Sequence, residues 1–163
     1  MSLQTARTID VHAHVLLDEV MRAAGTCGPE ILFDSDTPVF RVGDYRLRNM
    51  CYRGSAFMDP ELRVARMNDA DIDSQLLSPN PLTYFHFIPA ADAIAFCRAH
   101  NDALAALVAR YPDRLGGLVA LPVQDVTAAA TLIFAGWDQP RHVSDLHIDV
   151  DLAGNARRLL RAA

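Results

Sequence analysis

The sequence predicts an α/β fold with a parallel sheet, because short apolar segments alternate with amphipathic helical segments along most of the chain. Three apolar segments with strand character occupy residues 8–15, 74–78 and 115–121. Helical segments connect them, as right-handed crossovers between parallel strands require. Such units build either a doubly wound sheet or a (β/α)8 barrel. A closed barrel typically needs around 250 residues, which is more than the 163 of this chain.

The first predicted strand carries two histidines, His12 and His14, toward its C-terminal end. Side chains alternate between the two faces of a strand, so both imidazoles are expected to point the same way. In parallel α/β sheets, ligands bind beyond the C-terminal ends of the strands. The spacing therefore indicates part of a divalent metal site. The alternative is a pair of interior histidines that only form hydrogen bonds.

The segment after this strand shows no sustained periodicity of apolar residues. Residues 16–24 are expected to form a loop or short helix that ends at Gly25. Residues 25–57 are rich in Gly, Pro, Asp and Arg and predict a long irregular insertion. Long loops within a domain are usually functional.

Two helices are predicted from capping residues and periodicity. Asp59 as N-cap and Pro60 at the first helical position begin a helix that reaches about Ala70. The second helix has one face defined by a 3-4-3-4-3 spacing and ends at Pro112. That face consists of Ile94, Cys97, Asn101, Leu104, Val108 and Tyr111. His100 lies near the polar edge of this pattern and is expected at the surface.

The chain after the third strand predicts one more helix. Asp125 is expected to be its N-cap, and the alanine-rich residues 128–130 favour helix.

Composition restricts the class of protein. With 51% hydrophobic and 21% charged residues, the chain is expected to form one globular domain, residues 1–163. A net charge of −5 argues against nucleic acid or an anionic membrane surface as the main partner, so a small-molecule ligand is expected. No apolar run approaches the roughly 20 residues that span a bilayer. A cytoplasmic location with reduced cysteines is expected, since the three cysteines form no C-x-x-C pair.

A series of short motifs runs in order through residues 8–130. They are IDVHAH at 9–14, DPELR at 59–63, MNDA at 67–70, QLLSP at 75–79, NDALA at 101–105, YPDRLGGL at 111–118 and LPVQD at 121–125. With these motifs the chain resembles the amidohydrolase superfamily, and within it the amidohydrolase-related branch typified by aminocarboxymuconate-semialdehyde decarboxylase. The resemblance implies a metal-dependent hydrolase or carboxy-lyase that acts on a small carboxylic acid. It also implies a partial (β/α)8 TIM barrel with about three β/α units.

The resemblance implies roles for individual residues. His12 and His14 are expected to be metal ligands, with Zn²⁺ as the expected metal. An arginine from the loop after the first strand is expected to hold the substrate carboxylate, and Arg48 fits best, with Arg53 as the second candidate. A guanidinium suits a carboxylate because it donates two parallel hydrogen bonds; the alternative is a solvated loop arginine. His86, after the second strand, is expected to line the mouth of the site or simply to cap a loop.

The chain departs from the family after residue 130. No segment corresponds to strands 4 to 7 of the family's barrel, and residues 131–163 resemble instead the family's C-terminal end. Residues 132–140 look like the eighth strand, which makes Asp138 a metal ligand and proton acceptor. The competing interpretation is a helix over residues 127–134. His142, His147 and Asp149 are expected to be solvated; the alternative is that one of them replaces a lost metal ligand.

A partial barrel has two open sheet edges, and a homodimer is expected to cover them. The alternative function is a catalytically inactive, internally deleted family member that acts only as a fold fragment or interaction partner.

Overall fold

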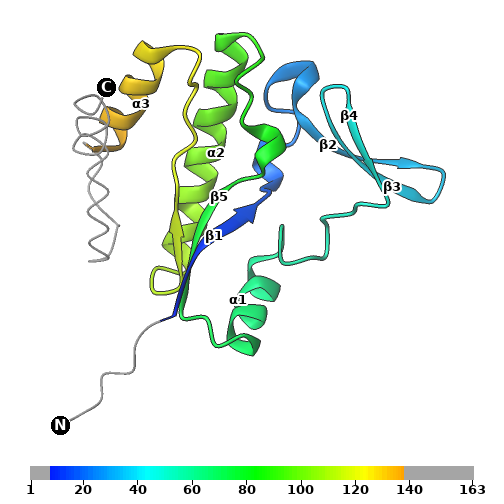
Figure 1. Ribbon diagram of the computed structural model, residues 1–163, viewed down its shortest axis with the longest axis vertical. Helices are drawn as coiled ribbons and strands as arrows, with labels where there is room; N and C mark the ends of the chain where they lie inside the picture. Colours follow the sequence, from blue (N-terminus) through cyan, green and yellow to red (C-terminus); the bar gives the residue numbers. More distant parts are fainter. Residues whose placement is uncertain (1–7, 138–163) are drawn as a thin grey trace, which may run out of the picture.

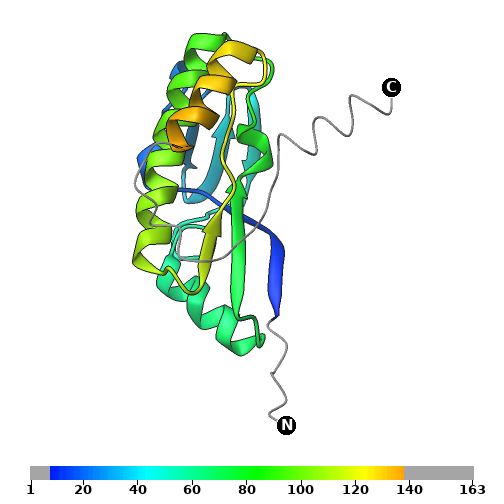
Figure 2. The same cartoon turned by 90° about the vertical axis from the view of Figure 1, so that its left-hand side faces the viewer.

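The computed structural model describes residues 8–137, which form a parallel sheet, a separate antiparallel sheet and three α-helices (Figure 1). The parallel sheet consists of β1 (Ile9–Val15), β5 (Ser74–Pro79) and β6 (Leu115–Gly117) in the order β1-β5-β6. Helix α2 (Ala90–Arg110) connects β5 to β6 and runs along one face of this sheet (Figures 1 and 2). The predicted α/β class is confirmed. Within residues 8–137 the sheet is open at β1 and β6, so no closed barrel forms.

Helix α1 (Pro60–Asp69) begins as predicted. The carboxylate of Asp59 accepts the backbone N–H of Leu62 at 3.0 Å, and Pro60 occupies the first turn, where its missing N–H costs nothing. The inward face of α1 buries Arg63 and Met67. This helix therefore brings one charged side chain against the parallel sheet.

Helix α2 buries a different stripe from the predicted one. Its buried residues are Ala93, Phe96, Cys97, His100, Leu104 and Leu107, of which only Cys97 and Leu104 were expected there. The prediction that His100 lies at the surface is wrong, because this side chain is 1% exposed and stacks on Phe96 with ring centroids 5.9 Å apart. Burial lowers the pKa of His100 to about 4, so the ring is neutral near pH 7.

The prediction of an irregular insertion over residues 25–57 is wrong for residues 29–48, whereas residues 49–57 contain neither helix nor strand. Strands β2 (Pro29–Asp34), β3 (Thr37–Val42) and β4 (Tyr45–Arg48) form an antiparallel sheet in that order. Both connections are two-residue hairpin loops, Ser35-Asp36 and Gly43-Asp44, and Gly43 adopts the positive φ of +57° that such loops require. The preceding residues contain two short 3-10 turns, η1 (Asp18–Val20) and η2 (Gly25–Cys27).

The third parallel strand is shorter than the predicted 115–121, because β6 ends at Gly117. Beyond it, the side chain of Asn101 on α2 takes over the backbone pairing. Its Nδ2 donates to the carbonyl of Ala120 at 3.0 Å, and its Oδ1 accepts the N–H of Ala120 at 2.8 Å. The chain therefore turns toward α2 instead of continuing in the sheet.

Helix α3 (Val126–Trp137) decides between the two interpretations of the chain's last part. Residues 132–137 are helical, so the eighth-strand interpretation is wrong for them and the helical one is confirmed. Asp125 is the N-cap, as predicted, and its carboxylate accepts the N–H of Ala128 at 2.9 Å. Asp138, His142, His147 and Asp149 lie outside the described residues, as does the remainder of the predicted 131–163 tail.

The two sheets share one hydrophobic core. Phe40 and Tyr52 from the insertion pack edge to face at 4.8 Å, and they belong to the same cluster as Leu77 of β5 and Phe96 of α2. Among residues 8–137, no helix combines the length and the hydropathy needed to cross a membrane.

Candidate metal centre

The two histidines lie on β1 beside a β-bulge. Asp10 pairs with Gln75 of β5, and Ala13 pairs with Leu77, so β1 contains one residue more than β5 over this stretch. Val11 and His12 have no partner in this register. A bulge of this kind changes the direction of the side chains around it and is frequent next to active sites.

The structure brings the two imidazoles together. Their ring centroids are 4.9 Å apart and their planes are inclined by 80°. His12 is exposed, whereas His14 is half-buried. Two imidazoles this close, one of them open to solvent, present the kind of nitrogen donors that bind Zn²⁺ and related divalent cations.

Hydrogen bonds fix the tautomer of His14. Its Nδ1 lies 3.0 Å from the carbonyl oxygen of Pro79 and 2.8 Å from Oγ of Ser78. A carbonyl only accepts, so Nδ1 carries the proton and donates it to Pro79. Ser78 accepts the same proton and donates its own to the carbonyl of Ala13 at 3.3 Å. In the neutral imidazole with this tautomer, Nε2 of His14 has the lone pair that a metal ligand requires.

The residues described fit a divalent cation as part of its ligand set. His12 and His14 supply two imidazoles, but residues 8–137 contain no group of three or more His, Cys, Asp and Glu side chains that could hold a metal. A catalytic zinc usually has three protein ligands. At least one further ligand is therefore needed from outside this part of the chain or from another molecule.

A chain of polar side chains lies beside the histidines, and sequence reasoning missed it. It runs from Arg63 on α1 through Gln75 on β5 to Asp10 on β1. Arg63 is only 6% exposed, and its burial lowers the pKa of its guanidinium while the charge of Asp10 opposes that change. One signal was available: Arg63 and Met67 are four residues apart and share a face of the predicted helix.

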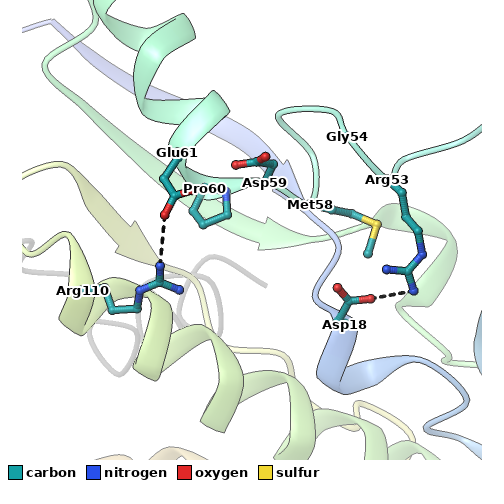
Figure 3. A pocket seen from close by; sticks show the side chains of 8 residues that line it. All are labelled: Asp18, Arg53, Gly54, Met58, Asp59, Pro60, Glu61 and Arg110. Atoms are coloured by element: carbon teal, nitrogen blue, oxygen red, sulfur yellow. Dashed lines mark ion pairs between the residues drawn. The ribbon is translucent and has the colours of Figure 1, made fainter.

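A pocket with a volume of about 320 Å³ lies elsewhere on the described surface. Figure 3 shows its lining side chains: Asp18, Arg53, Gly54, Met58, Asp59, Pro60, Glu61 and Arg110. Neither histidine lines it. Arg53 is paired with Asp18 at 2.8 Å, and Arg110 with Glu61 at 3.6 Å. Three carboxylates face two guanidiniums here, so the cavity offers no excess positive charge to an anion.

The other predicted site residues have partners other than the histidines. Arg48 ends β4 and pairs with Asp34 at 2.8 Å, and both side chains are 61% exposed. His86 is exposed in the loop before α2, where its ring contacts Phe87 with centroids 5.3 Å apart. Within residues 8–137, no hydrogen bond or ring contact joins Arg48, Arg53 or His86 to the histidine pair. Their roles, and that of Asp138, stay predictions.

Comparison with known proteins decides the family. A family model described as amidohydrolase matches residues 9–136. The chain belongs to the amidohydrolase family. The resemblance noted in the sequence is thereby confirmed, and the parallel sheet corresponds to part of the barrel found in solved structures of this family.

Several decarboxylases of this family are similar to the chain. The 2-amino-3-carboxymuconate-6-semialdehyde decarboxylase of Caenorhabditis elegans is 32% identical over 137 residues, which cover 78% of this chain and 32% of that protein. Gamma-resorcylate decarboxylase of Rhodococcus jostii (strain RHA1) is 37% identical over 70 residues, 43% of this chain and 21% of that protein. The chain thus spans about a third or less of the curated relatives it matches.

A solved structure gives the same result. The dihydroxybenzoic acid decarboxylase of Polaromonas sp. JS666, with bound manganese and the inhibitor 2-nitroresorcinol, superposes with a TM-score of 0.56 at 26% identity. The match covers 79% of this chain and 34% of that one. This part of the amidohydrolase fold is therefore present in the chain, and the remaining part of the barrel has no counterpart among the described residues.

Proposed function

We propose that this chain supplies the first two metal ligands of an amidohydrolase-family decarboxylase or hydrolase that acts on a small carboxylic acid. The observation that carries the proposal is the state of His14. Its Nδ1 donates to the Pro79 carbonyl, its Nε2 keeps a lone pair, and the ring of His12 stands 4.9 Å away. The family and its similar decarboxylases support the reaction class.

A divalent cation bound by His12 and His14 would polarise a substrate oxygen and lower the pKa of a bound water. Zn²⁺ is the metal expected from the sequence, and the bound manganese of the similar structure makes Mn²⁺ the second metal to test. In decarboxylation, the bond between the substrate carbon and its carboxylate breaks, CO2 leaves, and a proton replaces it on carbon. Asp138 is proposed to move that proton.

Arg48, with Arg53 as the second candidate, is proposed to hold the substrate carboxylate through paired hydrogen bonds. Each would exchange its present partner, Asp34 or Asp18, for the substrate. If the loaded chain is active, Arg48→Ala or Arg53→Ala is expected to raise KM with kcat nearly unchanged, because a carboxylate contact binds ground state and transition state alike. His86→Ala then tests the proposed place of His86 at the mouth of the site.

Calorimetric titration of the metal-free chain with Zn²⁺ and with Mn²⁺ tests the metal site. We expect about one cation per chain, because the pair forms a single site. Loss of an outer partner of a metal ligand typically weakens metal binding by up to about 100-fold. His12→Ala and His14→Ala each remove a ligand itself, so each is expected to weaken binding by more than that. His86→Ala is the matched control, since it removes an exposed imidazole outside the pair. Equal binding by all four proteins would contradict the proposal.

The second candidate is an inactive fold fragment or interaction partner. It is favoured by the missing third ligand among residues 8–137 and by the open edges of the parallel sheet. It predicts weak or absent metal binding although His12 and His14 are intact. Metal stoichiometry therefore separates the two functions.

The open edges also motivate a homodimer. Val11 on the β1 edge is 65% exposed, and Val119 beyond β6 is 58% exposed. Burying apolar side chains at an unpaired strand edge favours association. Sedimentation of the chain at micromolar concentration is expected to show a dimer, and a stable monomer would contradict this expectation.

A further inference from the structure

A continuous set of hydrogen bonds links helix α1 to the backbone of both histidines. The guanidinium of Arg63 donates from Nη2 to the carbonyl of His14 at 2.6 Å and from Nη1 to Oε1 of Gln75 at 3.0 Å. Nε2 of Gln75 donates to Oδ2 of Asp10 at 2.8 Å. Oδ1 of Asp10 accepts the backbone N–H of His12 at 3.0 Å. The set therefore begins at one histidine and ends at the other.

The donor and acceptor groups of Arg63, Gln75 and Asp10 allow only one arrangement of these hydrogen bonds. Arg63 only donates and Asp10 only accepts, so the amide of Gln75 is held in one orientation, with its oxygen toward Arg63 and its nitrogen toward Asp10. Turning the amide over would place donor against donor and acceptor against acceptor. The direction of every hydrogen bond in the set is thereby determined.

The bulge explains why β1 needs this support. Val11 and His12 fall outside the register with β5, so the ladder does not hold the backbone between them. The carboxylate of Asp10 accepts the N–H of His12 in place of a strand carbonyl. On the other side of the bulge, the carbonyl of His14 accepts a hydrogen bond from the guanidinium of Arg63. Both ends of the histidine segment are fixed by the same set of side chains.

The ring of His14 is held separately. Ser78 and Pro79 orient the imidazole, whereas Arg63 contacts only the backbone of the residue. Arg63 is 6% exposed, so water competes little for its hydrogen bonds. A buried guanidinium with two fixed acceptors orders the atoms around it more than an exposed one does.

The geometry points to Arg63, Gln75 and Asp10 as positioning residues that fix the distance and direction between His12 and His14 for a shared divalent cation. This inference rests on the proposed metal site. It assigns no contact with metal or substrate to these three residues. They act through the backbone of the two histidines.

The test is zinc affinity of the full chain with Arg63→Lys, which keeps the positive charge and removes the two-pronged donor. Outer partners of metal ligands typically contribute about 10–100-fold to metal affinity, and we expect a loss in this range. Arg66→Lys is the matched control, because Arg66 lies on the same helix, is 71% exposed and pairs only with Asp69 at 3.8 Å. It should bind zinc as the unsubstituted chain does.

A second variant covers the case in which Arg63→Lys does not fold. Asp10→Asn leaves one acceptor oxygen for two donors, so either His12 or Gln75 loses its partner. We expect a loss of zinc affinity of about tenfold or more, while circular dichroism shows an unchanged metal-free fold. Wild-type affinity in every variant that folds would overturn the inference, provided that His14→Ala abolishes binding.

The two proposals fail differently. If the unsubstituted chain binds no cation, the proposed function fails, and the positioning role is then measured in the metal-free chain. Imidazole nitrogen NMR reports the tautomer and surroundings of each histidine. Arg63→Lys should shift the His12 and His14 signals and leave those of His86 unchanged, whereas Arg66→Lys should shift none. Unchanged His12 and His14 signals in Arg63→Lys would overturn the inference.

Discussion

The polar side chains packed beside the parallel sheet and the Arg48–Asp34 pair of the antiparallel sheet differ in burial. Beside the parallel sheet, Arg63 and His100 are almost fully buried, and Arg63 has specific acceptors. On the antiparallel sheet, the pair between Arg48 and Asp34 is 61% exposed on both sides. Buried polar groups are costly to disturb, whereas exposed ion pairs contribute little. Chemistry that depends on fixed geometry is therefore expected beside the parallel sheet, where the histidines lie.

The largest expected effect tests whether the two sheets are one cooperative unit. Phe40 of β3 is 0% exposed and belongs to the common core, so Phe40→Ala should lower the free energy of unfolding of the whole chain by about 3–5 kcal/mol. Urea unfolding should still show one transition. Phe33→Ala, at a 64% exposed position of β2, should change stability by less than about 0.5 kcal/mol. Separate transitions in Phe40→Ala would show that the sheets unfold independently.

The next effect concerns the buried histidine of α2. The pKa of His100 falls from 6.5 to about 4 on folding, so the unfolded chain binds more protons between these values. Stability from the neutral ring is complete above pH 6.5 and is lost as the pH falls toward 4. At about 1.36 kcal/mol per pKa unit, the loss is at most about 3 kcal/mol.

Chemical unfolding at several pH values measures this loss. His100→Leu replaces the imidazole with an apolar side chain of similar size that cannot titrate. It should remove most of the change in the free energy of unfolding between pH 6.5 and 4. His86→Ala is the control and should retain this change. A change that persists in His100→Leu would assign the pH dependence to other groups.

Two arginines of the antiparallel sheet form ion pairs that differ in burial, so their substitution tests how burial affects the contribution of an ion pair to stability. Arg41 is 17% exposed, pairs with Glu30 at 2.7 Å and donates to the carbonyls of Thr26 and Gly43. Arg41→Met should therefore cost about 1–3 kcal/mol, because it removes the donor of two carbonyls and leaves the half-buried carboxylate of Glu30 with only the exposed Arg22 as its partner. Arg48→Met should cost less than about 1 kcal/mol. Equal costs in thermal unfolding would contradict the distinction by burial.

The smallest effect concerns the cap of the helix that carries Arg63. Asp59→Ala removes the acceptor for the N–H of Leu62 and should cost about 1 kcal/mol in urea unfolding. Asp102→Ala, at an exposed position within α2, is the control and should be nearly neutral. A neutral Asp59→Ala would mean that solvent replaces the cap without loss.

The parts of the fold that could be predicted are those with a local signal in the sequence. The strands at β1 and β5 follow from short apolar segments, and the start of α1 follows from the Asp59-Pro60 cap. Both signals act locally. The antiparallel sheet was missed because its apolar and charged residues mix without a clean period. The two-residue loop Gly43-Asp44 between β-prone segments was the available signal.

The candidate site was only partly predictable for a similar reason. Strand geometry predicts that His12 and His14 point to the same face, whereas the β-bulge beside them has no signal in the sequence. Their support depends on Arg63 and Gln75, which are distant from β1 in sequence, so no local pattern announces it. His100 was misplaced because a polar residue type is usually found at the surface, and here the tertiary packing of α2 buries it.

The most direct test of the central claim is the X-ray absorption spectrum of the zinc-loaded full chain beside a His12→Ala/His14→Ala double variant. The metal centre proposed here predicts scattering from two protein imidazoles around zinc, at nitrogen distances of about 2.0–2.1 Å. That scattering should be absent from the double variant. Zinc without imidazole neighbours, or identical spectra from the two proteins, would contradict a metal site built on this histidine pair.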